Sequence, residues 1–184
     1  MNWLVDEFGR EVLPRPIVLP AELIPAEYDG SLAAAEDLCA RVADRMGLPS
    51  GQCALSLGLV CGGGGGGFRR PAYRGVVKEH SGRWIRGATG NEIHLAPALA
   101  ADPVALVEIY AHEAGHELLL GSGRVSFARR PGRESLTDLL TVFYGLGIFT
   151  ANAAYERRPR PNGPGQAAAG PGYLREVALS DALA

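Results

Sequence analysis

The stretch that determines the fold is Ala111-His112-Glu113-Ala114-Gly115-His116, an H-E-x-x-H pattern inside an apolar segment. If this segment is a helix, residues four apart share a face, and His112 and His116 can bind one metal ion between them. Glu113 projects beside them, where its carboxylate can accept a proton from metal-bound water. The chain has four histidines, and two of them belong to this pattern. The pattern therefore predicts a metal site, with Glu113 as the catalytic general base.

Helix signals on both sides of the pattern support this prediction. Asp102 is a typical N-cap residue, and Pro103 is a typical first residue of a helix. A mostly apolar run continues from there through the motif to Leu120, and Gly121 is expected to end the helix as its C-cap. We therefore expect one helix over 103–120, with the motif in its second half.

A catalytic zinc ion usually has three protein ligands, so a third must come from elsewhere in the chain. The extended pattern H-E-x-x-H-x-x-G-x-x-H is absent, because Leu119 and Ser122 occupy its last two fixed positions. Instead, Glu134 and Asp138 stand four residues apart beside an apolar run, hence on one face of a second helix. One of them would bind the metal, and the other would accept the second ring N–H of a ligating histidine.

The residues alone leave the choice of third ligand open. Ser135-Leu136-Thr137-Asp138 also fits a capping box, which would place Glu134 just outside the helix and make Asp138 the ligand. Alternatively, both acids are charges at a helix N-terminus that the helix dipole favours, and neither binds a metal.

The order of these motifs resembles a known clan. H-E-x-x-H followed after a short connection by E-x-x-x-D is similar to the gluzincin metallopeptidases, which include the thermolysin-like enzymes and small bacterial domains that cleave repressors. Glu-Ser-Leu-Thr-Asp-Leu-Leu-Thr-Val from Glu134, with Gly-Leu-Gly-Ile-Phe from Gly145, also resembles a group of small uncharacterised bacterial proteins. The resemblance covers roughly 91–155. It implies Zn²⁺ held by His112, His116 and Glu134, with Asp138 orienting His112.

The resemblance also implies where a substrate binds. In gluzincin-like enzymes, a strand before the motif helix lines the cleft and pairs with an extended substrate, and residues 91–95 occupy that place here. A peptide would add along this edge by main-chain hydrogen bonds, with Ile93 and Leu95 as substrate-binding residues. On the same strand, His94 is expected to be structural. Glu108, one turn before His112, is expected to be exposed, and the alternative is that it supports a metal ligand.

The rest of the chain predicts a few further elements. A helix is expected from Leu32 to Met46, with Ser31 as its N-cap and Gly47 just past its end. Its apolar residues share one face, and Cys39 among them is expected to be a small core residue. Four short strands are expected at 53–60, 73–78, 83–86 and 92–95.

The expected fold class is α+β. A minimal zincin-like domain would span residues 31–156, with a small, mostly antiparallel sheet packed on the motif helix and on the second, glutamate-bearing helix. Residues 1–30 hold four prolines and are expected to form an extended N-terminal arm. The six glycines Gly62–Gly67 predict a flexible loop. Residues 157–184 predict a Pro/Gly-rich loop and a C-terminal helix that packs on the domain.

The composition of the chain limits which partners and which cellular location are expected. With 184 residues and a net charge of −2, the chain lacks the basic excess that nucleic acid or an acidic membrane surface requires. The uncharged stretch 139–155 is short for a membrane span and is expected to be a buried core helix. Three cysteines (Cys39, Cys53 and Cys61) form no C-x-x-C pair, and the N-terminus lacks a signal-peptide pattern. These features indicate reduced thiols and a cytoplasmic location.

These expectations together predict a zinc-dependent metallopeptidase or peptidase-like hydrolase with a peptide or protein substrate. Water activated by the metal would attack a peptide bond, with Glu113 as general base. The alternative is a non-catalytic gluzincin-like domain that uses the metal for stability or binds a protein partner through its sheet edge. Structural zinc normally has four protein ligands, and three are evident here, which favours the enzyme.

Overall fold

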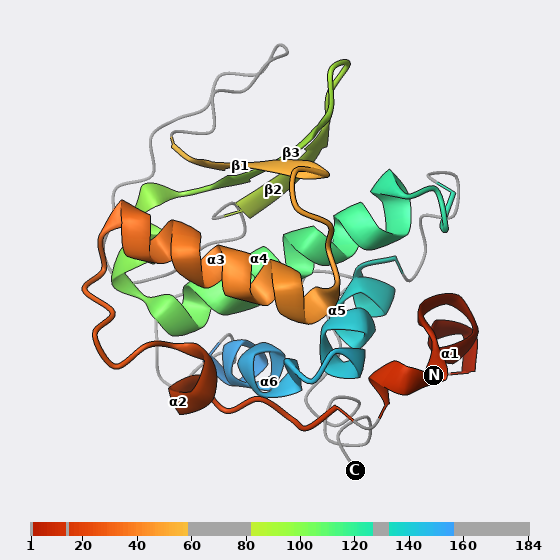
Figure 1. Cartoon of the computed structure of the whole chain (residues 1–184), viewed down its shortest axis with the longest axis horizontal. Coiled ribbons are helices and arrows are strands. Elements are labelled where there is room, and N and C mark those ends of the chain that lie inside the picture. Colours follow the sequence, from red (N-terminus) through yellow and green to blue (C-terminus); the bar gives the residue numbers. More distant parts are fainter. Residues whose placement is uncertain (1, 14, 59–81, 127–132, 157–184) are drawn as a thin grey trace, which may run out of the picture.

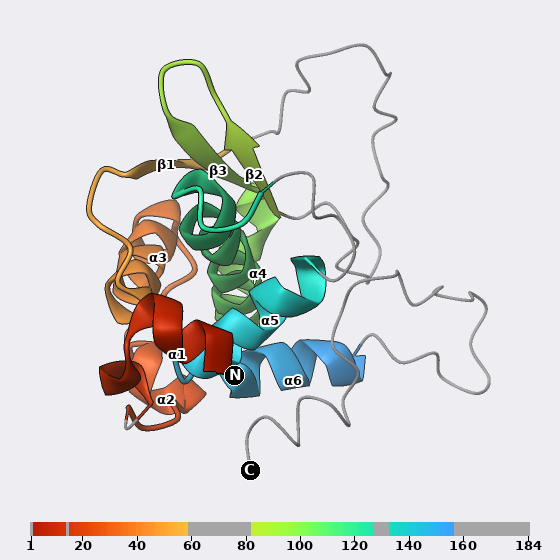
Figure 2. The same cartoon turned by 90° about the vertical axis from the view of Figure 1, so that its right-hand side faces the viewer.

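The computed structural model describes residues 2–13, 15–58, 82–126 and 133–156, and it shows an α+β arrangement (Figure 1). A three-stranded sheet lies over α3 and α4, and α5, α6 and the N-terminal segments lie on the far side of these two helices (Figures 1 and 2). The helices are α1 (Asn2–Phe8), α2 (Pro20–Leu23), α3 (Leu32–Met46), α4 (Pro103–His116), α5 (Arg133–Phe143) and α6 (Gly147–Glu156). The strands are β1 (Cys53–Leu57), β2 (Gly82–Arg86) and β3 (Asn91–Leu95). Short 3-10 turns occupy Arg10–Val12 and Pro97–Ala101, and a π-helical turn occupies Glu117–Gly121.

The sheet is mixed, with strand order β1-β3-β2. β1 runs parallel to β3, and β2 runs antiparallel to it, so the expected antiparallel pairing holds for one of the two strand pairs. β3 is the central strand, and the prediction that residues 91–95 form an edge is therefore wrong. The expected strand 73–78, the Gly62–Gly67 loop and the tail 157–184 lie outside the described residues.

Alternation along β3 separates a buried face from an outer face. Ile93 and Leu95 are 1% and 0% exposed, because side chains two apart in a strand point to the same side, here toward the helices. Glu92 and His94 point to the opposite side and remain partly exposed. Trp84 of β2 pairs with Ile93 and so shares the inner face.

α3 has the bounds and the caps expected from its sequence. The Ser31 hydroxyl accepts a hydrogen bond from the Ala34 N–H at 3.1 Å, and Gly47 past the end has a φ of +67°. A left-handed residue at this position suits glycine, which has no Cβ to clash. One face of α3 is buried against α4 and includes Cys39, which is a core residue as expected. Its buried side chains are Ala35, Leu38, Cys39, Val42 and Met46.

The motif helix begins as expected and ends differently. Asp102 accepts a hydrogen bond from the Ala105 N–H at 3.1 Å, which caps the first turn of α4. The regular helix ends at His116, where the π-helical turn begins, and the left-handed glycine is Gly123, with a φ of +78°. The prediction of Gly121 as C-cap is therefore wrong. Gly121 instead leaves room for the carboxylate of Glu117, which occupies the space a Cβ would need.

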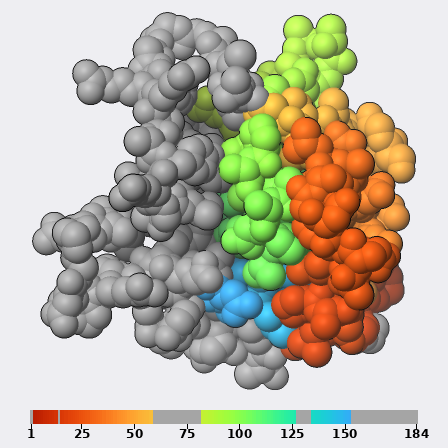
Figure 3. All heavy atoms as spheres, turned by 90° about the vertical axis from the view of Figure 1, so that its left-hand side faces the viewer, coloured from red at the N-terminus to blue at the C-terminus, as the bar shows by residue number. Residues whose placement is uncertain are grey.

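The N-terminal segment packs on the domain as short helices rather than as an extended arm. Leu4 of α1 is 1% exposed. The Val18 N–H donates to the Gly145 carbonyl at 2.9 Å, and Arg45 of α3 donates to the carbonyls of Pro16 and Tyr144. Four prolines exclude a long helix, but they leave room for single turns between them. In Figure 3, the red N-terminal segment and the orange α3 lie beside the blue residues of α6.

The uncharged stretch 139–155 forms parts of two helices rather than one. α5 ends at Phe143 and α6 begins at Gly147, with a turn between them in which Gly145 has a φ of +84°. A side chain at this turn would be strained by the backbone and would also meet Arg45 and the Pro16 carbonyl, each 2.8 Å from an added Cβ. Within the described residues, the helices are too short or too polar to cross a membrane.

Candidate metal centre

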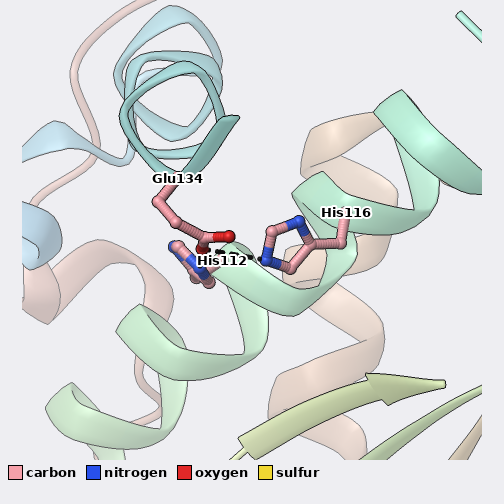
Figure 4. A group of neighbouring side chains, drawn as sticks. All are labelled: His112, His116 and Glu134. Carbon is pink, nitrogen blue, oxygen red and sulfur yellow. Dashed lines mark hydrogen bonds and ion pairs between the residues drawn. The ribbon is translucent and has the colours of Figure 1, made fainter. Parts of the chain in front are cut away.

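The predicted ligands from two helices meet at one point. His112 and His116 project from α4, and Glu134 reaches toward both rings from the first turn of α5 (Figure 4). Oε2 of Glu134 lies 3.1 Å from His112 Nε2 and 3.3 Å from His116 Nε2. One ligand atom from each residue can be chosen so that all three lie within 4.8 Å of one another. The chain therefore brings together two imidazole nitrogens and one carboxylate oxygen.

α5 also orients the two imidazole rings. His112 Nδ1 donates to Asp138 Oδ1 at 2.9 Å, and His116 Nδ1 lies 3.3 Å from the Thr137 hydroxyl. Asp138 and Thr137 are 3% and 0% exposed, so both partners are held in place by packing. Because each Nδ1 contacts a residue of α5, the Nε2 atoms of both rings face Glu134. A metal bound at Nε2 needs this ring orientation.

α5 begins at Arg133, which places Glu134 inside the helix. The arrangement in which a capping box at Ser135 leaves Glu134 outside the helix is thus not the one observed. Thr137 was not singled out in the sequence, although its spacing carried a signal. It is three residues after Glu134 and therefore faces α4 with it.

A glycine inside the motif permits the close approach of α5. A Cβ added at Gly115 would lie 2.7 Å from Cγ2 of Thr137, closer than packed carbon atoms approach. Because Gly115 lies between His112 and His116 on α4, the absence of its side chain lets α5 come near enough for Glu134 to reach both rings. The second variable position of the H-E-x-x-H motif therefore has a packing role here.

The charges within the cluster stabilise one another. Burial of the His112 ring alone would lower its pKa, but hydrogen bonds to Asp138 and Glu134 outweigh burial and raise the pKa of His112 to about 10. Hydrogen bonds from His112 and His116 hold the pKa of the Glu134 carboxyl well below its usual range. The metal-free centre is therefore an imidazolium–carboxylate cluster at neutral pH, in which a metal ion would replace a proton.

The donor set fits zinc. Two imidazole nitrogens and one carboxylate are a His₂Glu set of catalytic zinc sites, which leaves a fourth position for water. Tetrahedral ligands at zinc–ligand distances of 2.0–2.1 Å are about 3.3 Å from one another. The two nitrogen–oxygen separations, 3.1 and 3.3 Å, are compatible with this spacing, and one ligand atom from each of the three residues lies within 4.8 Å of the others.

Glu113 lies on an adjacent side of α4, where β2 packs. Its Oε2 accepts a hydrogen bond from the main-chain N–H of Trp84 at 2.6 Å. Gly82 makes this contact possible, since a Cβ there would meet Ile109 and would lie 3.2 Å from Glu113 Cγ. The carboxylate of Glu113 is therefore held at the outer edge of β2, one residue along the helix from the first metal ligand.

Several other predicted positions lie elsewhere. Ile93 and Leu95 are buried in the central strand and are not available to a substrate, because β1 and β2 occupy both sides of β3 and the helices cover this face. His94 lies on the outer face of the sheet and hydrogen-bonds Glu92 at 2.6 Å, away from the predicted site. Glu108 is 8% exposed, so the expectation that it is exposed is wrong.

Comparisons with known proteins do not identify this chain: no family model matches it, and neither a curated protein nor a solved structure is significantly similar to it.

Proposed function

We propose that this protein is a zinc-dependent metallopeptidase or peptidase-like hydrolase with a gluzincin-like site in a zincin-like domain. The observation that carries the proposal is the convergence of His112, His116 and Glu134 from two helices, with one ligand atom of each within 4.8 Å of the others. Asp138 and Thr137 support it, because their contacts with the two Nδ1 atoms orient both rings with Nε2 toward Glu134.

The residues around the centre have separate roles in the proposed reaction. Zinc, when bound, would polarise a substrate carbonyl and acidify a water molecule. Glu113 would accept a proton from that water and deliver it to the leaving amine. His112, His116 and Glu134 would hold the metal, and the partners of the two histidines on α5 would keep their rings in place.

Glu113 lies beside β2 rather than beside β3. Because the Trp84 N–H bonds to Glu113, this N–H points away from β3. A substrate that reaches Glu113 would therefore lie beside β2.

The test is Glu113→Gln, with Glu36→Gln on the exposed side of α3 as the matched control. Zinc per chain is measured by elemental analysis, and hydrolysis is followed with dye-labelled unfolded casein. We expect Glu113→Gln to retain zinc and to lose about 10²- to 10⁴-fold in rate, because only the proton acceptor is removed. Protein that carries no zinc, or a His112→Ala variant with unchanged zinc content, would contradict the proposal.

A non-catalytic role for the same centre is the second candidate. It is favoured by the position of the ligands, since Glu134 would join the first turn of α5 to α4 through the metal. In that case the wild-type protein binds zinc without hydrolysing casein, and a chelator unfolds it. An enzyme site would leave the fold largely intact when the metal is removed.

A further inference from the structure

Glu117, the residue immediately after the H-E-x-x-H motif, carries a carboxylate buried against the sheet. It is 1% exposed and accepts three hydrogen bonds from neutral donors. Trp84 Nε1 and Asn91 Nδ2 donate to Oε2 at 2.6 and 2.8 Å, and Gln52 Nε2 donates to the other oxygen at 3.0 Å. These donors come from β2, from β3 and from the loop before β1. One carboxylate therefore fixes three sheet segments to the end of α4.

Trp84 links this carboxylate to Glu113. Its main-chain N–H donates to Glu113, and its indole N–H donates to Glu117, both at 2.6 Å. Glu113 and Glu117 are four residues apart, so they share one side of the helical segment. The position of the Trp84 main chain relative to Glu113 therefore depends on where Glu117 holds the indole.

Stability alone does not account for a buried acid at this position. Burial of an ionised carboxylate carries a large desolvation cost, which neutral donors offset only in part, and an apolar side chain would join a sheet to a helix without that cost. The carboxylate instead fixes the orientation of the donor side chains, because a single oxygen accepts hydrogen bonds from Trp84 of β2 and Asn91 of β3 at once. The chain also accommodates it locally, since the carboxylate lies where a Cβ at Gly121 would be.

We propose that Glu117 is a positioning residue for Glu113: it anchors the Trp84 indole, and the anchored Trp84 main chain directs the carboxylate of Glu113. An effect of Glu117 on hydrolysis rests on the proposed function, whereas the anchoring of Trp84 by Glu117 does not depend on it. Glu117 would act through Trp84 and would touch neither substrate nor metal.

The direct test is amide hydrogen exchange at position 84, measured by NMR in Trp84→Phe. Phenylalanine keeps most of the ring packing and removes only the indole donor. Without the anchor, the residue 84 amide should lose its bond to Glu113 and exchange about tenfold faster, in keeping with one hydrogen bond to a charged acceptor. The amides of Arg83 and Ile85, which point toward β3, should keep their rates. Trp3→Phe, at the other tryptophan of the chain, is the matched control and should leave the exchange rates of the residue 83, 84 and 85 amides unchanged.

Glu117→Gln and Glu117→Ala extend the test. The amide oxygen of glutamine can accept from Trp84 and Asn91 together, and the side chain of Gln52 can turn its own oxygen toward the new NH₂ group. Protection at residue 84 should therefore persist in Glu117→Gln and disappear in Glu117→Ala. If Glu117→Ala does not fold, Trp84→Phe decides the question.

Two results overturn the proposal: unchanged exchange at residue 84 in Trp84→Phe, or equal acceleration of all β2 amides, which would indicate loss of the strand. With zinc-loaded protein and dye-labelled casein, Trp84→Phe should lower the hydrolysis rate about tenfold with unchanged zinc content. If wild-type protein does not hydrolyse casein, the proposed enzyme function fails, and the exchange data still decide the positioning role.

Discussion

α4 packs against α5 on one side and against β2 on another, and the two contacts are built differently. On the α5 side, His112 and His116 meet carboxylates and a hydroxyl, and the charges of the cluster are opposite in sign. On the β2 side, the hydrogen bonds that Glu113 and Glu117 accept within the described residues come from neutral N–H groups of Trp84, Asn91 and Gln52. One side therefore suits a bound cation, and the other holds two acids in fixed positions.

The sequence His-Glu occurs twice, at 112–113 and at 116–117, one helical turn apart. Neighbouring residues are separated by about 100° around a helix, so the two histidines form one row and the two glutamates form another. The row of histidines faces α5, and the row of glutamates faces β2. This comparison indicates that the motif residues divide the proposed metal site and the attachment of the sheet between adjacent sides of one helix.

The largest effect on zinc is expected from Glu134→Ala. Removal of this ligand from the α5 side should weaken zinc binding more than about 100-fold, since loss of a residue that only supports a ligand already costs 10- to 100-fold. Titration against a competing chelator measures this change. Glu117→Gln on the β2 side is the contrasting variant and should leave zinc affinity unchanged. Equal losses in both variants would contradict the division of roles.

Asp138→Asn should weaken zinc binding about 10- to 100-fold. The amide is weaker than the carboxylate as an acceptor for His112 Nδ1, and it does not oppose the charge of the site. The same chelator competition gives the affinity, and circular dichroism confirms the fold. An Asp138→Asn protein with wild-type affinity would show that the contact on α5 does not support the ligand.

Zinc affinity should fall about tenfold for each unit by which the pH is lowered between about 8 and 6. Zinc must displace the proton that His112 carries below its raised pKa of about 10, so one proton is released per metal bound. Calorimetry in buffers of different ionisation enthalpy counts this proton. In the metal-free protein the raised pKa acts in the opposite direction: the stability that protonated His112 contributes is complete below about pH 6.5 and is lost as the pH rises toward 10. A pH-independent zinc affinity over this range would contradict the protonated cluster.

The smallest effects are expected from two glycine substitutions that compare the contacts directly. In Gly115→Ala the new methyl group meets Thr137 Cγ2, which should move α5 and weaken zinc binding several-fold. Addition of Thr137→Ser removes that methyl, keeps the hydroxyl, and should restore binding. Gly82→Ala meets Ile109 and Leu95 on the β2 side, and should lower unfolding stability by about 1–3 kcal/mol without changing zinc affinity. Chemical denaturation and chelator competition measure the two quantities, and weaker zinc binding in Gly82→Ala would contradict the comparison.

Local signals in the sequence were sufficient to predict α3 and the start of α4, the helix that carries the two histidines of the motif. Ser31 and Asp102 cap their helices as expected, and the four-residue spacing of His112 and His116 needs only a helix to bring them together. Glu134 could be identified as one of two acids, but its choice over Asp138 depended on where α5 begins. α5 begins at Arg133, before both acids, and the spacing of the acids does not reveal that start.

The wrong predictions concern contacts between segments far apart in the chain. The alternation of apolar and polar residues in Asn91–Leu95 indicates a strand with one buried face. This alternation does not reveal the order of strands in the sheet, in which β2 is an edge strand and β3 is central. Gly121 follows an apolar run like a typical C-cap, yet the turn it occupies forms around Glu117, whose partners are on the sheet. Glu108 has a charged side chain and is nevertheless buried, and its burial could not be predicted from the neighbouring residues in the sequence.

The contact between the N-terminal segment and the turn before α6 has a consequence for biosynthesis. During translation, Val18 emerges long before Gly145, the residue whose carbonyl receives its N–H. His112 and Glu134 are much closer in the chain, and the helices that carry them can pack as soon as both have left the ribosome. The segment around Val18 is therefore expected to be fixed in place late, after α4 and α5 have packed together.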